Sequence, residues 1–350
     1  MQYIAFDVHK RYTVAVVEEE QGRNRRHARI DHDDGAFRTF LSRCELGSPV
    51  ALETTGNWYW IVDQIEAAGM SPRLVNALKA KHMLGSENKT DRLDAQGLNV
   101  LQRSGTLPTV WIPPAPLRDL RELFRTRMVV QRISVRLKNR ILATYRKYNL
   151  SEVEVADRFG KRGQELLRQR LSLVPPYTRL VLEELFEQLN HALATVKRIE
   201  KRMQESFATD ERMSLLESLP GVGSILGAVI LSEIGDISRF PSASHFAAYA
   251  GTTPRVYSSG DRTHYGHTQV AVNHYLKWAF AEAANVICMN HHRWPHRHVC
   301  RLYLRLRARK GHGVAIGAVA RHLAEATFHV LSRKEVYREP SIEAHSSTRG

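Results

Sequence analysis

The sequence predicts an α/β domain followed by a mostly helical chain, and three observations support this class. Through Val75, short apolar segments end at turn residues, which is typical of strands that alternate with helices. From Leu117 onward, apolar residues recur at helical spacing instead. Prolines at positions 108, 113, 114 and 116 mark the boundary between the two patterns. We therefore expect an α/β domain at 1–107, a helical region at 108–208, a mostly helical C-terminal domain at 209–335 and a flexible tail at 336–350.

Positive charge is concentrated after the first of these regions. The 350 residues include 51 Lys and Arg against 36 Asp and Glu, a formal net charge of +15. Through Gly105 the two signs balance at 14 each, so the whole excess, 37 basic against 22 acidic residues, lies beyond it. This asymmetry predicts a near-neutral catalytic head and a body that binds a polyanion.

Cysteine content and hydropathy indicate the compartment. Cys44, Cys288 and Cys300 do not make a disulfide framework, which favours a reducing cytoplasm. No apolar run reaches ~18 residues and the first residues lack the pattern of a signal peptide, so no membrane partner is expected. Cys and His gather between Cys288 and Cys300, but not at the spacing of a structural zinc site.

The elements of the first domain are predicted to follow the order of an RNase H-like (RuvC-like) α/β fold, in which helix and strand alternate after three antiparallel strands. The expected helices begin near Asp34 and at about Trp58, and we assign Trp58, Tyr59 and Trp60 to the core and a helix face rather than to base stacking. The expected strands are Tyr3–Asp7, Thr13–Glu18, about 27–30, Pro49–Glu53 and 72–75.

Four carboxylates fall at the ends of these elements. Asp7 closes the first strand, and Glu53 closes a buried parallel strand. Thr90 is a candidate cap for a helix whose first turns carry Asp91 and Asp94 on one face. Taken singly, each acid is also explained as a turn former, a cap or a solvated group. Together they predict a site for two Mg²⁺ ions, with Mn²⁺ as a substitute, that would promote phosphodiester transfer.

The helical region from Leu117 to Leu150 carries many arginines and lysines but only two acids. A solvated face usually mixes the two signs, so a long stripe of one sign favours contact with a phosphate backbone. After Pro175-Pro176, apolar residues from Leu182 to Met203 alternate gaps of three and four, which predicts a coiled-coil seam. The seam either folds back on the first helix or joins two protomers. The arginines assigned to nucleic acid are Arg118, Arg121, Arg125, Arg132, Arg136 and Arg140.

Two segments of the last third are candidates for nucleic-acid contact. Leu219-Pro220-Gly221-Val222-Gly223 is typical of a helix-hairpin-helix turn whose glycines, Gly221 and Gly223, let backbone N–H groups approach a phosphate. A plain tight turn between packed helices is the alternative. Residues 252–263 are expected to form a polar loop before a helix at about 270–285. A hydroxyl of Ser258 or Ser259 could attack phosphorus there while Arg255 and Arg262 hold the phosphate, although Ser-Ser-Gly is far more often only a loop sequence.

Several of these segments occur together, and in the same order, in one known family. The chain resembles the insertion-sequence transposases of the IS110 family, which join a DEDD-type RuvC-like domain to a C-terminal transposase domain. The resemblance covers roughly residues 1–335. The segments that carry it are Phe6–Lys10, Leu52–Gly56, Lys89–Ala95, Leu219–Gly223, Ala248–Gly251 with Pro254, and Ser258–Gly260.

The resemblance implies a role for each site residue. Asp7, Glu53, Asp91 and Asp94 take the four acidic positions, and Ser259 takes the nucleophile position, with Ser258 as the alternative. It further implies a phosphoserine link to DNA, strand exchange between double-stranded donor and target DNA, a structured guide RNA encoded by the element, and a homodimer or homotetramer.

The chain departs from the family pattern after the serine, where Val270 replaces a lysine and Val272 a glycine. Two other readings stay open at this point. One is a RuvC-like structure-specific DNA endonuclease whose serine loop only binds. The other is a non-catalytic nucleic-acid-binding protein.

Overall fold

In this computed structural model the chain forms two compact units, Met1–Ala115 (unit 1) and Pro116–Gly350 (unit 2). The structure describes residues 1–33, 35–85, 91–259, 262–268 and 271–340. Seven of these are described by their backbone only: Asp91, Arg92, Ser259, Arg262, Thr263, Tyr265 and His267.

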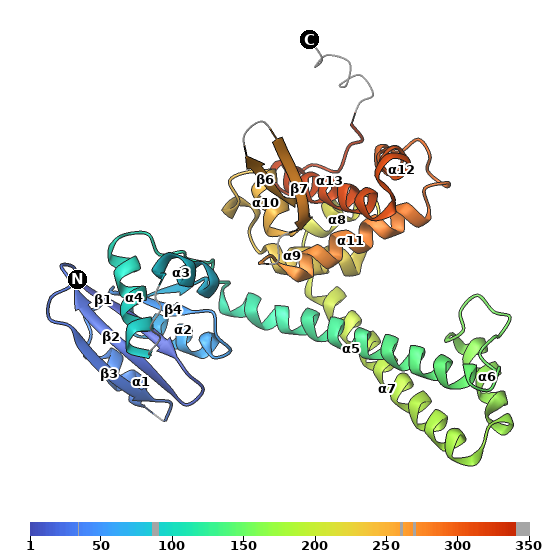
Figure 1. Cartoon of the computed structure of the whole chain (residues 1–350), viewed down its shortest axis with the longest axis horizontal. Coiled ribbons are helices and arrows are strands. Elements are labelled where there is room, and N and C mark those ends of the chain that lie inside the picture. The colour runs from blue at the N-terminus through green and yellow to red at the C-terminus, as the bar shows by residue number, and fades with distance from the viewer. Residues whose placement is uncertain (34, 86–90, 260–261, 269–270, 341–350) are drawn as a thin grey trace, which may run out of the picture. The chain divides into compact units, whose positions relative to one another are not determined.

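Unit 1 is built on a mixed five-stranded sheet with the order β3-β2-β1-β4-β5 (Figure 1). The first three strands pair antiparallel, and β4 and β5 continue the sheet in parallel with β1. This confirms the predicted α/β class and the predicted succession of three antiparallel strands followed by alternating helix and strand. The strands are β1 (Gln2–Val8), β2 (Tyr12–Glu19), β3 (Arg26–Asp31), β4 (Pro49–Glu53) and β5 (Ser71–Val75).

Helices cover both faces of this sheet because side chains alternate along each strand. Ile4, Phe6 and Leu52 face α1 (Ala36–Leu41) and α2 (Trp58–Ala67), and they form one core with the apolar residues of those helices. Ala5 and Ala51 point the opposite way, toward α3 (Ala77–Leu84) and α4 (Asp91–Arg103). The sequence did not predict α3, a short helix capped by the side chain of Asn76, which accepts from Lys79 N.

Two long helices of unit 2, which we call the arm together with the segment between them, fold back on each other. They are α5 (Ala115–Arg146) and α7 (Pro176–Ser206), joined through α6 (Lys161–Gln169) and the short turn η1 (Arg170–Leu173). The end of α5 shares a core with the start of α7, where Tyr145 packs near Phe186. Arg127 near the start of α5 pairs with Glu200 near the end of α7, at 2.6 Å. The apolar seam of α7 is therefore covered by α5 of the same chain.

The rest of unit 2 is a helical cluster with one two-stranded sheet (Figure 1). The segment predicted as a polar loop forms two antiparallel strands, β6 (Pro254–Ser259) and β7 (Arg262–Thr268), which we call the serine hairpin. That prediction was wrong because the polar composition of this segment resembles a loop, whereas its two halves pair as strands. The helices are α8 (Arg212–Glu217), α9 (Ser224–Ile234), α10 (Ala243–Tyr249), α11 (His274–Met289), α12 (His298–Lys310), α13 (His312–Arg333) and the short η2 (Ile237–Arg239).

Residues 336–340, expected to be part of a flexible tail, are bound to this helical cluster. The backbone N–H of Tyr337 donates to Ser218 Oγ at 2.8 Å. Glu339 accepts from the backbone N–H of His298, the first residue of α12, at 2.9 Å. The sequence did not predict these contacts because the segment is polar in composition. None of the helices that the structure describes is long and apolar enough to cross a membrane.

Candidate functional site

Asp7 and Glu53 lie at the same edge of the unit 1 sheet, on neighbouring strands. The parallel register pairs Phe6 with Leu52, so the next residues along the two strands are the two acids. Both follow Ala5 and Ala51 by two positions and therefore lie on the face that α4 covers. Adjacent strands are about 4.8 Å apart, so the strands themselves hold the two carboxylates as neighbours.

A chain of contacts runs from Asp7 into the loop after β4. His9 Nε2 lies 3.1 Å from Asp7 Oδ2. The backbone carbonyl of His9 accepts from Asn57 Nδ2 at 2.8 Å. In the same loop, the buried hydroxyl of Thr55 has no hydrogen-bond partner in the part of the chain that the structure describes. This edge of the sheet is therefore polar and only partly satisfied by protein groups.

The helix that carries the other two acids is anchored to β1 by uncharged side chains, and its last residue, Arg103, pairs with the buried Glu18 of β2 at 3.0 Å. Asn99 Nδ2 donates to Tyr3 O at 3.0 Å, and Gln102 Nε2 donates to Ile4 O at 3.1 Å. Asp94 is half-buried and precedes the buried Leu98 by four residues, so it continues the sheet-facing stripe of α4. Asp91 is the first residue of this helix, and its side chain lies outside the described part.

The residue types here suit a hard cation, because Asp7 and Glu53 offer only carboxylate oxygens and the Thr55 hydroxyl has no hydrogen-bond partner among the described residues. The structure does not bring Asp94 close enough to Asp7 and Glu53 for the three carboxylates to hold one metal ion. Among the described residues, no group of three or more His, Cys, Asp or Glu side chains stands close enough together to hold a metal ion. The side chain of Asp91, the fourth predicted ligand, lies outside the described part of the chain. The cysteines and histidines from Cys288 to Cys300, which are all described, form no such group either.

In unit 2, the two candidate nucleophiles lie at one end of the serine hairpin. Ser259 pairs with Arg262, and Ser258 pairs with Thr263 and is exposed. The side chains of Ser259 and Arg262 lie outside the described part, and so does Val270. At the other end of the hairpin, Lys277 Nζ of α11 donates to Thr268 Oγ1 at 2.6 Å. This lysine comes from a neighbouring element, whereas the family lysine would come from position 270.

A buried carboxylate that sequence reasoning missed links the arm to the helix after the hairpin. Glu233 of α9 is 1% exposed and accepts from both Arg125 Nε and Nη2, at 2.9 and 3.1 Å. Its other neighbours are Arg121, at 3.6 Å, and Asn273 Nδ2, which donates at 2.8 Å. Asn273 also caps α11, accepting from the N–H groups of Tyr275 and Leu276. The signal was present: one acid inside an otherwise apolar helix needs a partner.

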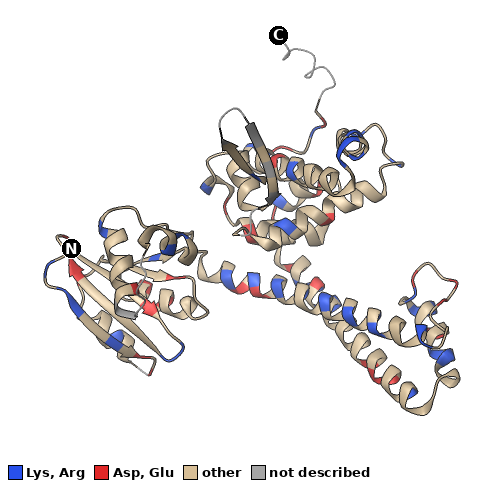
Figure 2. Cartoon of the chain, viewed as in Figure 1, with Lys and Arg blue, Asp and Glu red and all other residues tan. Residues whose placement is uncertain are grey.

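This network changes the interpretation of the arginine stripe. Arg118 and Arg121 are buried, and Arg121 donates to the carbonyls of Ser232 and Glu233 at 2.8 Å. Together with half-buried Arg125, they serve the interior of the protein, in contrast to the predicted phosphate contact. Burial lowers the pKa of Arg121, and the nearby Glu233 opposes this. Farther along α5, Arg132, Arg136 and Arg140 are exposed, as is Arg255 on the hairpin. Basic residues recur along the length of α5 (Figure 2).

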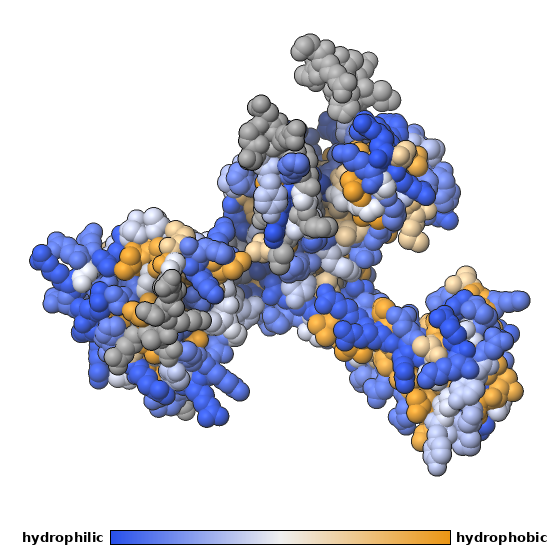
Figure 3. Space-filling model, viewed as in Figure 1, coloured by the Kyte–Doolittle hydropathy of each residue, from blue (hydrophilic) through white to orange (hydrophobic). Residues whose placement is uncertain are grey.

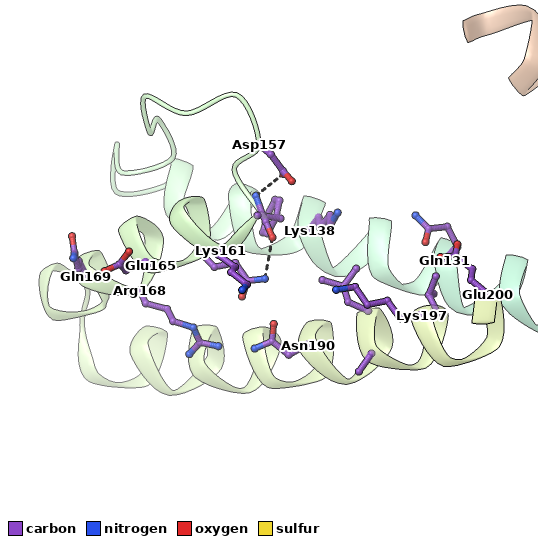
Figure 4. A pocket seen from close by; sticks show the side chains of 16 residues that line it. Gln131, Lys138, Asp157, Lys161, Glu165, Arg168, Gln169, Asn190, Lys197 and Glu200 are labelled. Carbon is purple, nitrogen blue, oxygen red and sulfur yellow. Dashed lines mark hydrogen bonds between the residues drawn. The ribbon is translucent and has the colours of Figure 1, made fainter. Parts of the chain in front are cut away.

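The arm also contains a groove of about 1110 Å³ between α5, α6 and α7 (Figure 4). Four cations line it: Lys138, Lys161, Arg168 and Lys197. Of the acids in the lining, Glu200 is already paired with Arg127. The groove therefore offers positive charge from three helices.

The two glycines of the predicted helix-hairpin-helix turn differ in their surroundings. Gly221 has a φ of +76°, and a Cβ there would lie 2.4 Å from the carbonyl oxygen of Ala283 in α11. Position 221 must therefore be glycine, because the backbone there packs directly against α11. Gly223 precedes α9, is exposed, and has open space around its Cα.

Two protein-family models match successive parts of the chain. Residues 4–150 match a model described as Transposase, the DEDD transposases of IS110. Residues 213–300 match a model described as Transposase IS116/IS110/IS902 family. The first match contains the four acids, and the second contains Glu233 and the serine hairpin.

Curated relatives carry the same description. The chain is 24% identical over 304 residues to a probable family 20 transposase of Pseudomonas aeruginosa, which covers 83% of this chain and 85% of that protein. It is 22% identical over 250 residues to the transposase for insertion sequence element IS1328 of Yersinia enterocolitica, covering 68% and 72%. A 44.8 kDa protein of insertion element IS116 from Streptomyces clavuligerus is 32% identical over 141 residues, but the match covers only 39% of this chain and 35% of that protein. The chain is a DNA transposase that belongs to the IS110 family of insertion sequences.

Proposed function

We propose that unit 1 is an RNase H-like domain whose four acids bind divalent metal and cut DNA for transposition. Asp7, Glu53, Asp91 and Asp94 would hold Mg²⁺, with Mn²⁺ as a substitute. Bound there, the metal would activate the attacking oxygen and stabilise the leaving one. The observation that carries this proposal is the position of Asp7 and Glu53 on adjacent parallel strands, facing the helix of Asp94.

The nucleophile of this reaction is proposed to be the hydroxyl of Ser259, with Ser258 as the alternative. The serine oxygen would bond to the scissile phosphorus as the bond from phosphorus to the 3′ or 5′ oxygen of the strand breaks. Return of that DNA hydroxyl to a new phosphoserine would rejoin strands without net hydrolysis. The exposed end of the hairpin, where Ser258 pairs with Thr263, supports access to DNA.

Nucleic acid is proposed to bind along the arm. Exposed Arg132, Arg136 and Arg140 and the cations of the groove suit a phosphate backbone, either of double-stranded donor and target DNA or of a structured guide RNA. We propose that the turn at Gly223 approaches a phosphate as a helix-hairpin-helix would. Ile133 and Leu180 are apolar side chains exposed on the arm. Apolar residues are also visible on the surface of the arm in Figure 3, and both observations support assembly as a homodimer or homotetramer.

Two alternatives are separated by one experiment. In a RuvC-like endonuclease, the acids alone would hydrolyse DNA and the hairpin would only bind. A non-catalytic nucleic-acid-binding protein would need neither catalytic acids nor a serine nucleophile. The experiment incubates the full-length protein with element-end DNA and the guide RNA, then isolates protein–DNA adducts under denaturing conditions.

A covalent adduct should form with the wild type and with Ser258→Ala, and should be absent with Ser259→Ala. Cleavage without any adduct in all three proteins would favour the endonuclease. Recombination that survives both Glu53→Gln and Asp91→Asn would favour a binder in which the acids have no catalytic role.

A further inference from the structure

A hollow of unit 1 opens on the α1 and α2 side of the sheet, next to the loops that follow Asp7 and Glu53. Its volume is about 430 Å³, and it opens between the β1–β2 turn, the start of α1 and the start of α2. Lys10, which lines it, follows Asp7 by three residues, and Asn57 follows Glu53 by four. The two loops that leave the acids therefore also form one wall of the pocket. Asn57 connects that wall to Asp7 through its hydrogen bond to His9.

An aromatic side chain in a fixed orientation lies in this pocket. Trp60 of α2 is 37% exposed, although the sequence analysis assigned it to the core and a helix face. Its ring meets Phe37 and His32 edge to face, with centroids 5.1 and 4.9 Å apart. His32 Nε2 is hydrogen-bonded to Thr13 Oγ1 at 2.8 Å, which fixes the imidazole against the tryptophan. A rigid, partly exposed indole is a suitable surface for stacking a base.

The polar groups around Trp60 are available. Within the described residues, the side chains of Gln64, Lys10 and Arg38 make no hydrogen bond or ion pair, and all three line the pocket. The amide of Gln64 can donate to and accept from the edge of a base. Lys10 and Arg38 can approach the adjoining phosphates, and among the described residues that line the pocket the one carboxylate is that of Asp33.

We propose that this pocket receives one unpaired base of the DNA strand that the acids cut. The inference rests on the proposed function of those acids. The base would stack on Trp60, pair its edge with Gln64, and so hold the neighbouring phosphate at the sheet edge. A base inside a duplex is already stacked on both faces, so a base that stacks on Trp60 must come from a locally unpaired strand.

Equilibrium binding of the full-length protein to two single-stranded probes tests the proposal. One probe is oligo(dT) of about 20 nucleotides, and the other is the same backbone with abasic sites, both followed by fluorescence anisotropy at salt high enough to weaken phosphate contacts. The wild type should prefer the base-bearing probe by about tenfold. Trp60→Ala should reduce this preference to about twofold or less. Trp294→Ala, which removes a tryptophan of matched exposure (38%) in unit 2, should keep it.

Two milder variants separate loss of the pocket from loss of the fold. Gln64→Ala keeps the Phe37–Trp60 packing and should lower the preference two- to threefold, roughly one hydrogen bond. Trp60→Phe should retain most of it, because phenylalanine still stacks. A preference that is unchanged in both Trp60→Ala and Gln64→Ala would overturn the inference.

The acids provide an independent control. Asp7→Asn should stop strand transfer and leave the preference for bases unchanged. If Asp7→Asn stops transfer while Trp60→Ala keeps the wild-type preference, only the base pocket is refuted. If Trp60→Ala loses the preference while Asp7→Asn still transfers strands, the proposed function of the acids is refuted and the pocket stands.

Discussion

Neutralising Glu233 should destabilise unit 2 far more than neutralising an exposed glutamate with a similar ion pair. Glu233→Gln keeps the size of the side chain but removes the buried carboxylate with which both Arg121 and Arg125 pair. Removing one partner of a buried pair costs about 3–5 kcal/mol. Arg125 remains 27% exposed and a glutamine still accepts one hydrogen bond, so we expect the lower end, about 3 kcal/mol.

The matched control is Glu205→Gln. Glu205 pairs with Arg202 at 2.9 Å, the distance at which Glu233 pairs with Arg125, but both partners are largely exposed. Exposed pairs of this kind contribute about 0.3–0.5 kcal/mol. Because the chain has two units, unfolding should be followed in unit 2 itself, by hydrogen exchange of peptides from α9 and α11 across a urea series.

Comparable losses in the two variants, or a loss below about 1 kcal/mol in Glu233→Gln, would refute this reasoning. A double-mutant cycle with Arg125→Met adds a second check. The losses of unfolding free energy in the two single variants should together exceed the loss in the double variant by about 1–3 kcal/mol. The reason is that removing both charges leaves less uncompensated charge in the interior of unit 2.

Three further changes test other parts of the structure. Gly221→Ala should destabilise unit 2 by more than about 1 kcal/mol in urea denaturation, since φ is +76° and Ala283 blocks a Cβ, whereas Gly223→Ala should cost less. Replacing Arg132, Arg136 and Arg140 together by alanine should reduce the slope of log binding constant against log salt by about 2–3, and an unchanged slope would contradict phosphate contact on that face. Burial lowers the pKa of His322 below its ordinary 6.5, so the unfolded chain takes up the proton first. The free energy of unfolding should therefore fall as pH drops below about 6.5, and His322→Gln should flatten that fall.

Much of unit 1 was predictable because its pattern is local. Buried runs such as Pro49–Glu53 and the antiparallel pair around His9-Lys10-Arg11 were read within one or two residues of β4, β1 and β2. The short helices α3 and α6 were missed because they have too few turns for a clear apolar period. The serine hairpin was missed because polar strands on a surface resemble a loop in composition.

In the candidate sites, too, the sequence revealed only what a local pattern can show. Asp7 and Glu53 were recognisable because each ends a strand, and a shared sheet edge follows from topology alone. Arg118, Arg121 and Arg125 were assigned to nucleic acid because a stripe of one sign looks unpaired along the sequence. The acid that pairs with Arg125 lies 108 residues away, and no local pattern reveals a partner at that separation.

Two amide side chains of α4 fix the position of this helix along the sheet. Asn99 and Gln102 are matched to particular backbone carbonyls of β1, so the helix has one preferred position along the sheet. A slip by a single residue would turn it by about 100° and carry Asp94 away from the strand that ends in Asp7. The position of the Asp94 carboxylate relative to Asp7 thus depends in part on the uncharged amides of Asn99 and Gln102. A substitution such as Gln102→Leu, which keeps the core apolar, should displace Asp94 without unfolding the domain.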